Sequence, residues 1–315
     1  MCSVNFKPSE ALRFLGAVAA TVIILGLITL RVTSGAPAQR PIATAPPAAA
    51  PRPATASARC DEGPRSAAVA NALSLKTLSW APFRRPEVGW ETYAPLIGRE
   101  LATACTPDTP GFAAALAIWQ SRQGYAADGV FADAVFMRMR GVIETRRPFV
   151  RLSANGVCPD APDEATLAAT ASDEGYGGKA ILLQPAALAA YRAMAAAARL
   201  EDARIAADPR NLTIFSGYRS PDADSARCGS KGNCDNLVRA TCSAHRTGLA
   251  LDLYVGQAPG FGPDSSADPN RRFMSQTPTY HWLVANADRY GFAPYPFEPW
   301  HWEWTGGPPG RANDP

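Results

Sequence analysis

The stretch Ser243-Ala-His-Arg-Thr-Gly-Leu-Ala-Leu-Asp252 brings a histidine, a glycine and an aspartate close together in the chain. Gly248 lets the backbone turn after His245. The alternation from Leu249 to Val255 predicts a β-strand in which Asp252 faces away from its apolar neighbours. The stretch therefore predicts a turn and a strand that each carry one side chain suited to bind a metal ion.

A second stretch, Phe297-Glu-Pro-Trp-His-Trp-Glu-Trp304, adds another imidazole and another carboxylate. Two of the three histidines of the chain, His245 and His301, lie in these two stretches. Catalytic zinc sites typically have three protein ligands and a water in the fourth position. We predict that His245, Asp252 and His301 bind one Zn²⁺. Glu298 is close enough to His301 in the chain to take a proton from the metal-bound water.

Other residues in or near these stretches allow competing interpretations. Cys242 and His245 form a Cys-x-x-His pair that suggests a different zinc site, although an exported cysteine more often forms a disulfide. Glu303 either orients a metal ligand or faces solvent. His281 lies outside both stretches and is interpreted as a structural or surface residue.

The two stretches together resemble the VanY-type zinc D,D-carboxypeptidases, through Ser-x-His-x-x-Gly-x-Ala-x-Asp followed by Glu-Pro-Trp-His. These enzymes belong to a wider group that includes D-Ala-D-Ala dipeptidases, phage endolysins and the hedgehog fold. The stretches Ser216–Ser220 and Trp282–Phe292 support the resemblance, which covers roughly residues 180 to 304. One position departs from the family pattern, because Asp224 stands where many members carry glutamine.

The resemblance implies an α+β fold with an antiparallel sheet and flanking helices, as in hedgehog and D-Ala-D-Ala peptidases. It implies removal of the C-terminal D-alanine from peptidoglycan stem peptides, with His245, Asp252 and His301 as zinc ligands. Glu298 is then the general base, and Arg219 stabilises the carbonyl oxygen as it gains negative charge. The further candidates, for substrate contact, are Ser243, Tyr218, Ser220 and Trp300.

Two other functions remain open at this stage. An endopeptidase that cuts within the stem or the cross-bridge would use the same zinc site. A non-catalytic wall-binding scaffold would need neither the three predicted ligands His245, Asp252 and His301 nor Glu298.

Secondary-structure patterns around these motifs predict a mixed domain at 148–308, followed by a tail at 309–315. Pro185 begins an alanine-rich helical run that extends to Ala207. The expected strands are 212–215, 249–255 and 300–304, and a helix from 280 to 290 is expected to end at Gly291.

Residues 60–147 are predicted to form a small all-α module. Phe112 and Trp119 recur at helical spacing, and Gly124 is placed to end that helix. A second helix is expected from Asp133. The pattern resembles the helical peptidoglycan-binding module found beside many cell-wall hydrolases. The alternative is a helical hairpin that packs on the catalytic domain.

The N-terminal region predicts export. Residues 1–34 hold an uncharged apolar run, Phe14–Leu30, preceded by Lys7 and Arg13, which is typical of a single-pass anchor or a signal peptide. The catalytic part is expected on the periplasmic side of the cytoplasmic membrane, or secreted if the run is cleaved. Residues 35–59 are rich in alanine and proline and form an expected linker.

The charge and cysteine content agree with this location. Residues 1–59 hold six of the 31 basic residues and one of the 28 acidic residues, so the remainder is slightly acidic and nucleic acid is not expected as a partner. Six cysteines follow Cys2, an even number that predicts up to three disulfides in an oxidising compartment. Cys228 and Cys234 are the one pair that we predict from their spacing.

Overall fold

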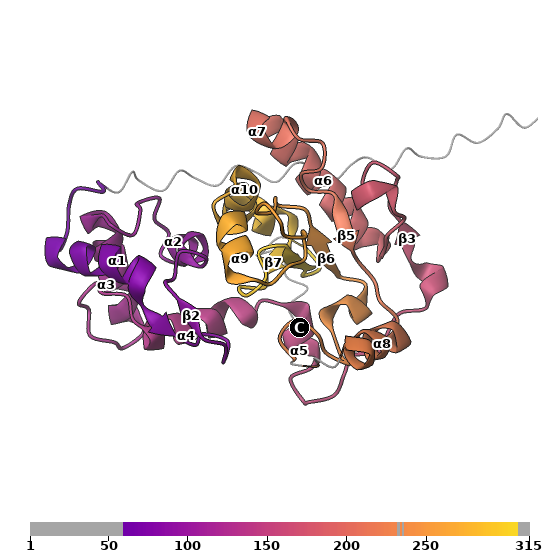
Figure 1. Cartoon of the computed structure of the whole chain (residues 1–315), viewed down its shortest axis with the longest axis horizontal. Helices are drawn as coiled ribbons and strands as arrows, with labels where there is room; N and C mark the ends of the chain where they lie inside the picture. Colours follow the sequence, from indigo (N-terminus) through magenta and orange to yellow (C-terminus); the bar gives the residue numbers. More distant parts are fainter. Residues whose placement is uncertain (1–58, 232–233, 235, 308–315) are drawn as a thin grey trace, which may run out of the picture. The chain divides into compact units, whose positions relative to one another are not determined.

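The computed structural model describes residues 59–307, apart from 232, 233 and 235 (Figure 1). The predicted membrane segment, almost all of the linker, and the tail lie outside the described residues. No helix within the described part is long and apolar enough to cross a membrane.

The N-terminal segment, residues 59–147, contains four helices and a two-stranded antiparallel sheet. Its elements are α1 (Arg65–Thr77), β1 (Ser79–Trp80), β2 (Glu87–Val88), α2 (Ala94–Glu100), α3 (Pro110–Arg122) and α4 (Asp133–Glu144). The predicted helices near Phe112 and from Asp133 are confirmed. The prediction of an all-α module is wrong, because Pro82 and Pro86 prevent a helix between β1 and β2 and the chain pairs as a short hairpin instead.

The remainder is a mixture of helices and short antiparallel strands, so the predicted α+β class is confirmed. A four-stranded sheet has the order β5-β6-β8-β7, and each neighbouring pair is antiparallel. The sheet strands are β5 (Ile214–Ser216), β6 (Ala250–Leu253), β7 (Phe292–Pro294) and β8 (His301–Trp304). The other elements are α5 (Pro148–Leu152), β3 (Ala168–Ala169), β4 (Leu182–Leu183), α6 (Pro185–Glu201), α7 (Ala203–Ala206), α8 (Pro221–Lys231), α9 (Asp268–Ser275) and α10 (Pro278–Asn286).

Two expected helices end because of a local feature of the chain, a capping side chain in one and a glycine in the other. The alanine-rich run does not continue unbroken to Ala207, because Asp202 is extended and its side chain accepts a hydrogen bond from the Arg204 amide to begin α7. After α10 the chain makes one 3-10 turn, Ala287–Tyr290, and ends at Gly291 with φ of 80°. The predicted stop at Gly291 is therefore confirmed.

The apolar side chains gather in two cores. The N-terminal core consists of Trp80, Phe83, Trp90, Tyr93, Ile97, Leu101, Cys105, Phe112, Leu116, Trp119, Phe131, Val135, Phe136, Met139 and Phe297. A second core surrounds the four-stranded sheet and includes Tyr191, Leu251, Leu253, Tyr280 and Trp302. Phe297 is notable in the first list, since it lies between β7 and β8 and more than 150 residues from its partners in the chain.

Three disulfides use all six cysteines of the described part. They join Cys60 to Cys105, Cys158 to Cys242, and Cys228 to Cys234. The predicted local pair is confirmed, and the number of bridges is the expected maximum of three.

Candidate active site

The turn before β6 presents His245 to the sheet. His245 lies in the 3-10 turn Ala244–Thr247, which ends at Gly248 with φ of 68°, as the need for a sharp turn predicted. The Nδ1 atom of His245 is 2.7 Å from the carbonyl oxygen of Gly217, and Nε2 is 3.2 Å from Oδ2 of Asp252. Because a carbonyl only accepts, Nδ1 carries the proton and Nε2 keeps its lone pair for a ligand bond.

Sheet register places the second histidine beside the same carboxylate. His301 on β8 is paired directly with Asp252 on β6. The Nδ1 atom of His301 is 2.9 Å from Oδ1 of Asp252. Its Nε2 atom is 3.4 Å from Oε1 of Glu303. His301 therefore directs Nδ1 toward Asp252 and Nε2 toward Glu303.

These three residues fit the donor set of a zinc ion. One ligand atom from each of His245, Asp252 and His301 lies within 4.8 Å of the other two, and all three residues are buried. Tetrahedral ligands at 2.0–2.2 Å from zinc are separated by about 3.3 Å. Each histidine lies near this separation from one oxygen of Asp252, because Nε2 of His245 is 3.2 Å from Oδ2 and Nδ1 of His301 is 2.9 Å from Oδ1. The predicted ligands are therefore close enough to share one metal ion.

Glu298 lies beside this group without being part of it. Its Oε2 atom is 4.0 Å from Nδ1 of His301, and the residue is 8% exposed. Burial, together with the negative charge of Asp252, raises the pKa of Glu298 to about 8. A buried carboxylate with a raised pKa, next to a metal site, is suited to accept and release a proton.

Burial and the contacts among His245, Asp252 and His301 shift the pKa values of these three predicted ligands. Burial lowers the pKa of His245, and the positive charge of Arg219 adds to this. Burial acts against ionisation of Asp252, but the neighbouring His245 and His301 hold the pKa of its carboxyl well below the ordinary value. Burial also opposes protonation of His301, yet hydrogen bonds with Asp252 and Glu303 raise its pKa to about 9.

Glu303 contacts Nε2 of His301, the ring nitrogen that does not face Asp252. It is 1% exposed, and its Oε1 atom accepts a hydrogen bond of 2.6 Å from the guanidinium of Arg147. Its Oε2 atom accepts from the Phe149 amide at 2.9 Å. Although burial opposes it, the charge of Arg147 lowers the pKa of Glu303 to about 2. Of the two interpretations of Glu303, the one in which it orients a ligand is therefore supported, and a solvent-facing position is wrong.

Arg219 is held at the edge of the site by Asp224 and Ser216. Its Nε donates to Oδ1 of Asp224 at 2.9 Å, and Nη1 donates to the hydroxyl of Ser216 at 2.8 Å. The hydroxyl of Ser243 donates to Oδ2 of Asp224 at 2.7 Å. Asp224 therefore joins two predicted site residues, a role that sequence reasoning missed. The available signal was an acidic residue where the family often has glutamine.

The predicted residues line one cavity of about 620 Å³. The lining includes His245, Asp252, Glu298, His301, Arg219, Ser243 and Trp300. Tyr218 and Ser220 are not among the described residues that line it, and the hydroxyl of Ser220 instead accepts from the Ala223 amide at the start of α8. Tyr218 lies close to Glu164, whose charge contributes after burial to a raised pKa of the Tyr218 phenol. Substrate contact by these two residues stays a prediction.

Basic side chains line part of the same cavity, whose lining also includes the acidic Glu144 and Asp264. Lys179, Arg227 and Arg239 line it together with Arg219. Burial, and then the positive charges of Arg219 and Arg239, lower the pKa of Arg227. Arg219 and Arg239 are therefore close enough to repel the Arg227 guanidinium, and an anion beside it would be stabilised.

Two competing interpretations can now be judged. Cys242 is bonded to Cys158, so it is not free to form a zinc site with His245. His281 is exposed on α10 and does not line the cavity, as expected for a surface residue.

Comparison with known proteins agrees with this site. Residues 180–307 match the model of the VanY family, described as D-alanyl-D-alanine carboxypeptidase. A solved structure of the LdcB LD-carboxypeptidase is 23% identical, covers 46% of this chain and 70% of its own, and has a TM-score of 0.31. No curated protein matches the chain. The matched residues include His245, Asp252, Glu298 and His301, so the part of the chain that carries the site is similar to the VanY-type peptidases.

Proposed function

We propose that this protein is a zinc-dependent D,D-carboxypeptidase that removes the C-terminal D-alanine from peptidoglycan stem peptides. The observation that carries the proposal is the convergence of His245, Asp252 and His301 beside the buried Glu298, inside a VanY-type domain. We also propose that the four-stranded antiparallel sheet is that of the hedgehog and D-Ala-D-Ala peptidase fold, which such a domain implies.

The proposed reaction divides the chemistry between the metal and the protein. When bound, zinc lowers the pKa of a water and polarises the carbonyl of the peptide bond. The Glu298 carboxylate accepts the proton of the attacking water and delivers it to the amine of the departing D-alanine. The Arg219 guanidinium, fixed by Asp224, donates to the carbonyl oxygen as negative charge develops there.

The basic lining of the cavity favours a carboxypeptidase over an endopeptidase. A carboxypeptidase substrate ends in a free carboxylate, whereas the bond cut by an endopeptidase is followed by more peptide. Lys179, Arg227 and Arg239 lie around the cavity that contains the catalytic group. Arginine forms strong charge-assisted hydrogen bonds with carboxylates.

The test uses the full-length chain, loaded with zinc, and three substrates analysed by mass spectrometry. These are a muropeptide that ends in D-Ala-D-Ala, the same muropeptide with a C-terminal amide, and a cross-linked dimer. We expect loss of one alanine from the first and at least about 10-fold slower cleavage of the amide, because the amide lacks the carboxylate charge. Cleavage of the dimer alone would favour the endopeptidase, and inertness toward all three would favour the scaffold.

We further propose that the catalytic part acts outside the cytoplasm, next to its wall substrate. The apolar run at Phe14–Leu30 supports this location as a retained anchor or a cleaved signal. Disulfide bonding of the six cysteines after Cys2 is consistent with an oxidising compartment.

A further inference from the structure

The loop that carries Glu298 packs against the N-terminal segment. This loop, residues 295–300, joins β7 to β8, and the Tyr295 amide closes it by donating to the His301 carbonyl at 3.0 Å. The Phe297 side chain is fully buried in the N-terminal core, with its ring 5.1 Å from the ring of Phe83. Glu298 follows Phe297 directly in the chain and lines the catalytic cavity.

A buried arginine fixes the backbone at the same point. Arg271 on α9 is fully buried, and its Nε donates to the Phe297 carbonyl at 2.8 Å. Its guanidinium group also lies 4.0 Å from the centre of the Phe297 ring. The carbonyl that precedes Glu298 and the ring beside it are therefore both held by one side chain.

The N-terminal segment completes the bonding of this arginine. Arg271 donates through Nη1 to Oε1 of Glu87 at 3.0 Å and through Nη2 to the Tyr93 hydroxyl at 2.5 Å. The Tyr93 hydroxyl in turn donates to the Glu87 carboxylate. Arg271 Nη1 also lies 3.3 Å from Oδ1 of Asp268 on its own helix, which is more exposed than Glu87. Because a buried charge without a partner is very unfavourable, the buried Glu87 carboxylate helps to hold Arg271 where it donates to the Phe297 carbonyl.

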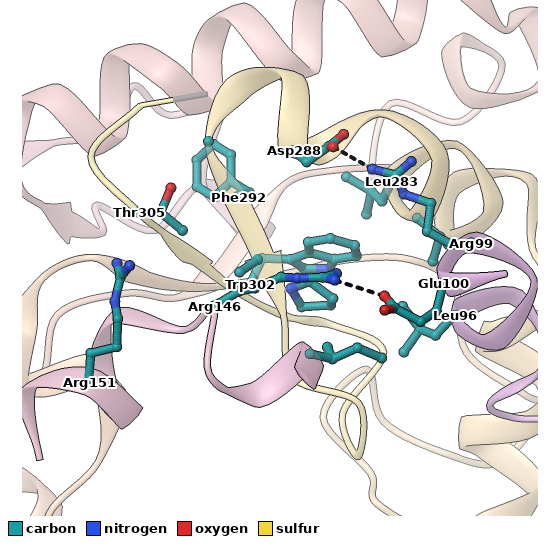
Figure 2. A pocket seen from close by; sticks show the side chains of 15 residues that line it. Leu96, Arg99, Glu100, Arg146, Arg151, Leu283, Asp288, Phe292, Trp302 and Thr305 are labelled. Atoms are coloured by element: carbon teal, nitrogen blue, oxygen red, sulfur yellow. Dashed lines mark hydrogen bonds and ion pairs between the residues drawn. The ribbon is translucent and has the colours of Figure 1, made fainter. Parts of the chain in front are cut away.

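Further ion pairs join the same segment to other parts of the peptidase region. Arg147 reaches Glu303 behind His301, as described above. In a second cavity, of about 570 Å³, Arg99 pairs with Asp288, as Figure 2 shows. The N-terminal segment is thus attached by side chains at several points, and two of them lead to residues adjoining the catalytic group.

We propose that the N-terminal segment positions the catalytic loop, with Glu87, Tyr93, Arg271 and Phe297 as the positioning residues for Glu298. The proposal rests on the proposed function, in which Glu298 moves the proton. It assigns residues 59–147 a part in the reaction itself, in addition to any binding of the wall. A displacement of about 1 Å at a reacting group can lower a rate by about 100-fold.

The test separates positioning from stability with two changes that compensate each other. Arg271→Met leaves the buried Glu87 carboxylate without its cation, with only the Tyr93 hydroxyl still donating to it, and is expected to unfold more easily. In the double variant Arg271→Met/Glu87→Gln no charge is left unpaired, so much of the thermal stability returns, but the Phe297 carbonyl still lacks its donor. We expect kcat of the double variant to stay about 10- to 100-fold below the unchanged protein, with KM and zinc content unaltered.

A second variant and a second readout do not depend on stability or turnover. Tyr93→Phe keeps the ring and removes one bond to Arg271, and we expect a smaller loss of kcat in the same direction. Hydrogen exchange of the zinc-loaded full-length chain, measured for the amides of Glu298 and His301, should become at least about 10-fold faster in the double variant, because these amides close the loop turns. The matched control is Arg289→Met/Glu201→Gln, which removes an ion pair between α6 and the turn after α10.

The outcomes distinguish this inference from the proposed function. A double variant with kcat within twofold of the unchanged protein and unchanged exchange of the loop would overturn the positioning role. An unchanged protein that is itself inert would contradict the proposed function, and the exchange result would then decide the positioning role alone.

Discussion

In each histidine of the site, one ring nitrogen contacts a supporting group of the protein and the other faces Asp252 at the predicted zinc site. The partner of His245 is a backbone carbonyl, whereas the partner of His301 is the Glu303 carboxylate. Partners of this kind fix the orientation and the tautomer of a metal-binding imidazole. The two histidines therefore depend on different parts of the chain, and only the support of His301 can be removed by changing one side chain.

We predict that Glu303→Gln weakens zinc binding by about 10- to 100-fold, which is typical of the loss of such a partner. The affinity is measured by competition with a coloured chelator on protein shown to be folded. Glu174→Gln, which alters an ion pair of similar kind on the surface, should leave the affinity unchanged. Equal affinities for Glu303→Gln and the unchanged protein would mean that Glu303 does not support His301.

Glu298→Gln should lower kcat by about 100- to 10,000-fold, because the amide cannot accept the proton of the attacking water. Zinc content should remain at one per chain, since Glu298 lies beside the ligands and is not one of them. The measurement combines turnover of the muropeptide with metal analysis of the same sample. An inactive variant that has also lost its zinc would count against the role of general base.

At the scale of elements, the turn between His245 and β6 depends on a backbone conformation that favours glycine. Gly248 has φ of 68°, and a Cβ atom there would lie 3.3 Å from Cγ of Gln184 and from Cδ2 of Leu167. Gly248→Ala should therefore lower the free energy of unfolding by about 1–2 kcal/mol. Thermal or urea unfolding checks this value.

The matched control for this substitution is Gly141→Ala. Gly141 lies within α4, and a Cβ atom there meets nothing within 4 Å. Alanine should stabilise that helix by up to about 1 kcal/mol. A Gly248→Ala protein as stable as the Gly141→Ala protein would show that the turn does not require the left-handed conformation.

The elements that sequence could predict are those with a strong local pattern. Alternation located β6, and the apolar spacing together with Gly291 located α10 and its end. The β1–β2 hairpin has only two residues in each strand, too few to show any periodicity. The end of α6 was missed because the capping hydrogen bond of Asp202 outweighs the helix preference of the alanine run.

In the candidate site, too, the sequence predicted the residues that lie in a local motif and missed the contacts between residues far apart in the chain. The metal group was predictable because each ligand lies in a short stretch with a characteristic spacing. The supporting bonds join residues far apart in the chain, as Arg147 to Glu303 and Asp224 to Ser243 do. Such pairs depend on how the elements pack, and no local pattern in the sequence records them.

At the scale of the whole molecule, the two predicted domains share side chains instead of being separate. Phe297 belongs to the N-terminal core. Arg271 donates hydrogen bonds both to Glu87 of the N-terminal segment and to the Phe297 carbonyl in the catalytic loop. The domain boundary at 147 and a wall-binding role for the N-terminal module stay predictions. The proposed positioning role agrees with the alternative of a helical unit that packs on the catalytic domain.

The most direct test of the central claim is a titration of the metal-free full-length chain with zinc, in which bound metal and release of D-alanine are measured together. We predict that both rise in proportion and saturate at one zinc per chain, and that His245→Ala and His301→Ala lose both. Full activity without metal, or one bound zinc retained in the two histidine variants, would contradict a zinc peptidase built on His245, Asp252 and His301.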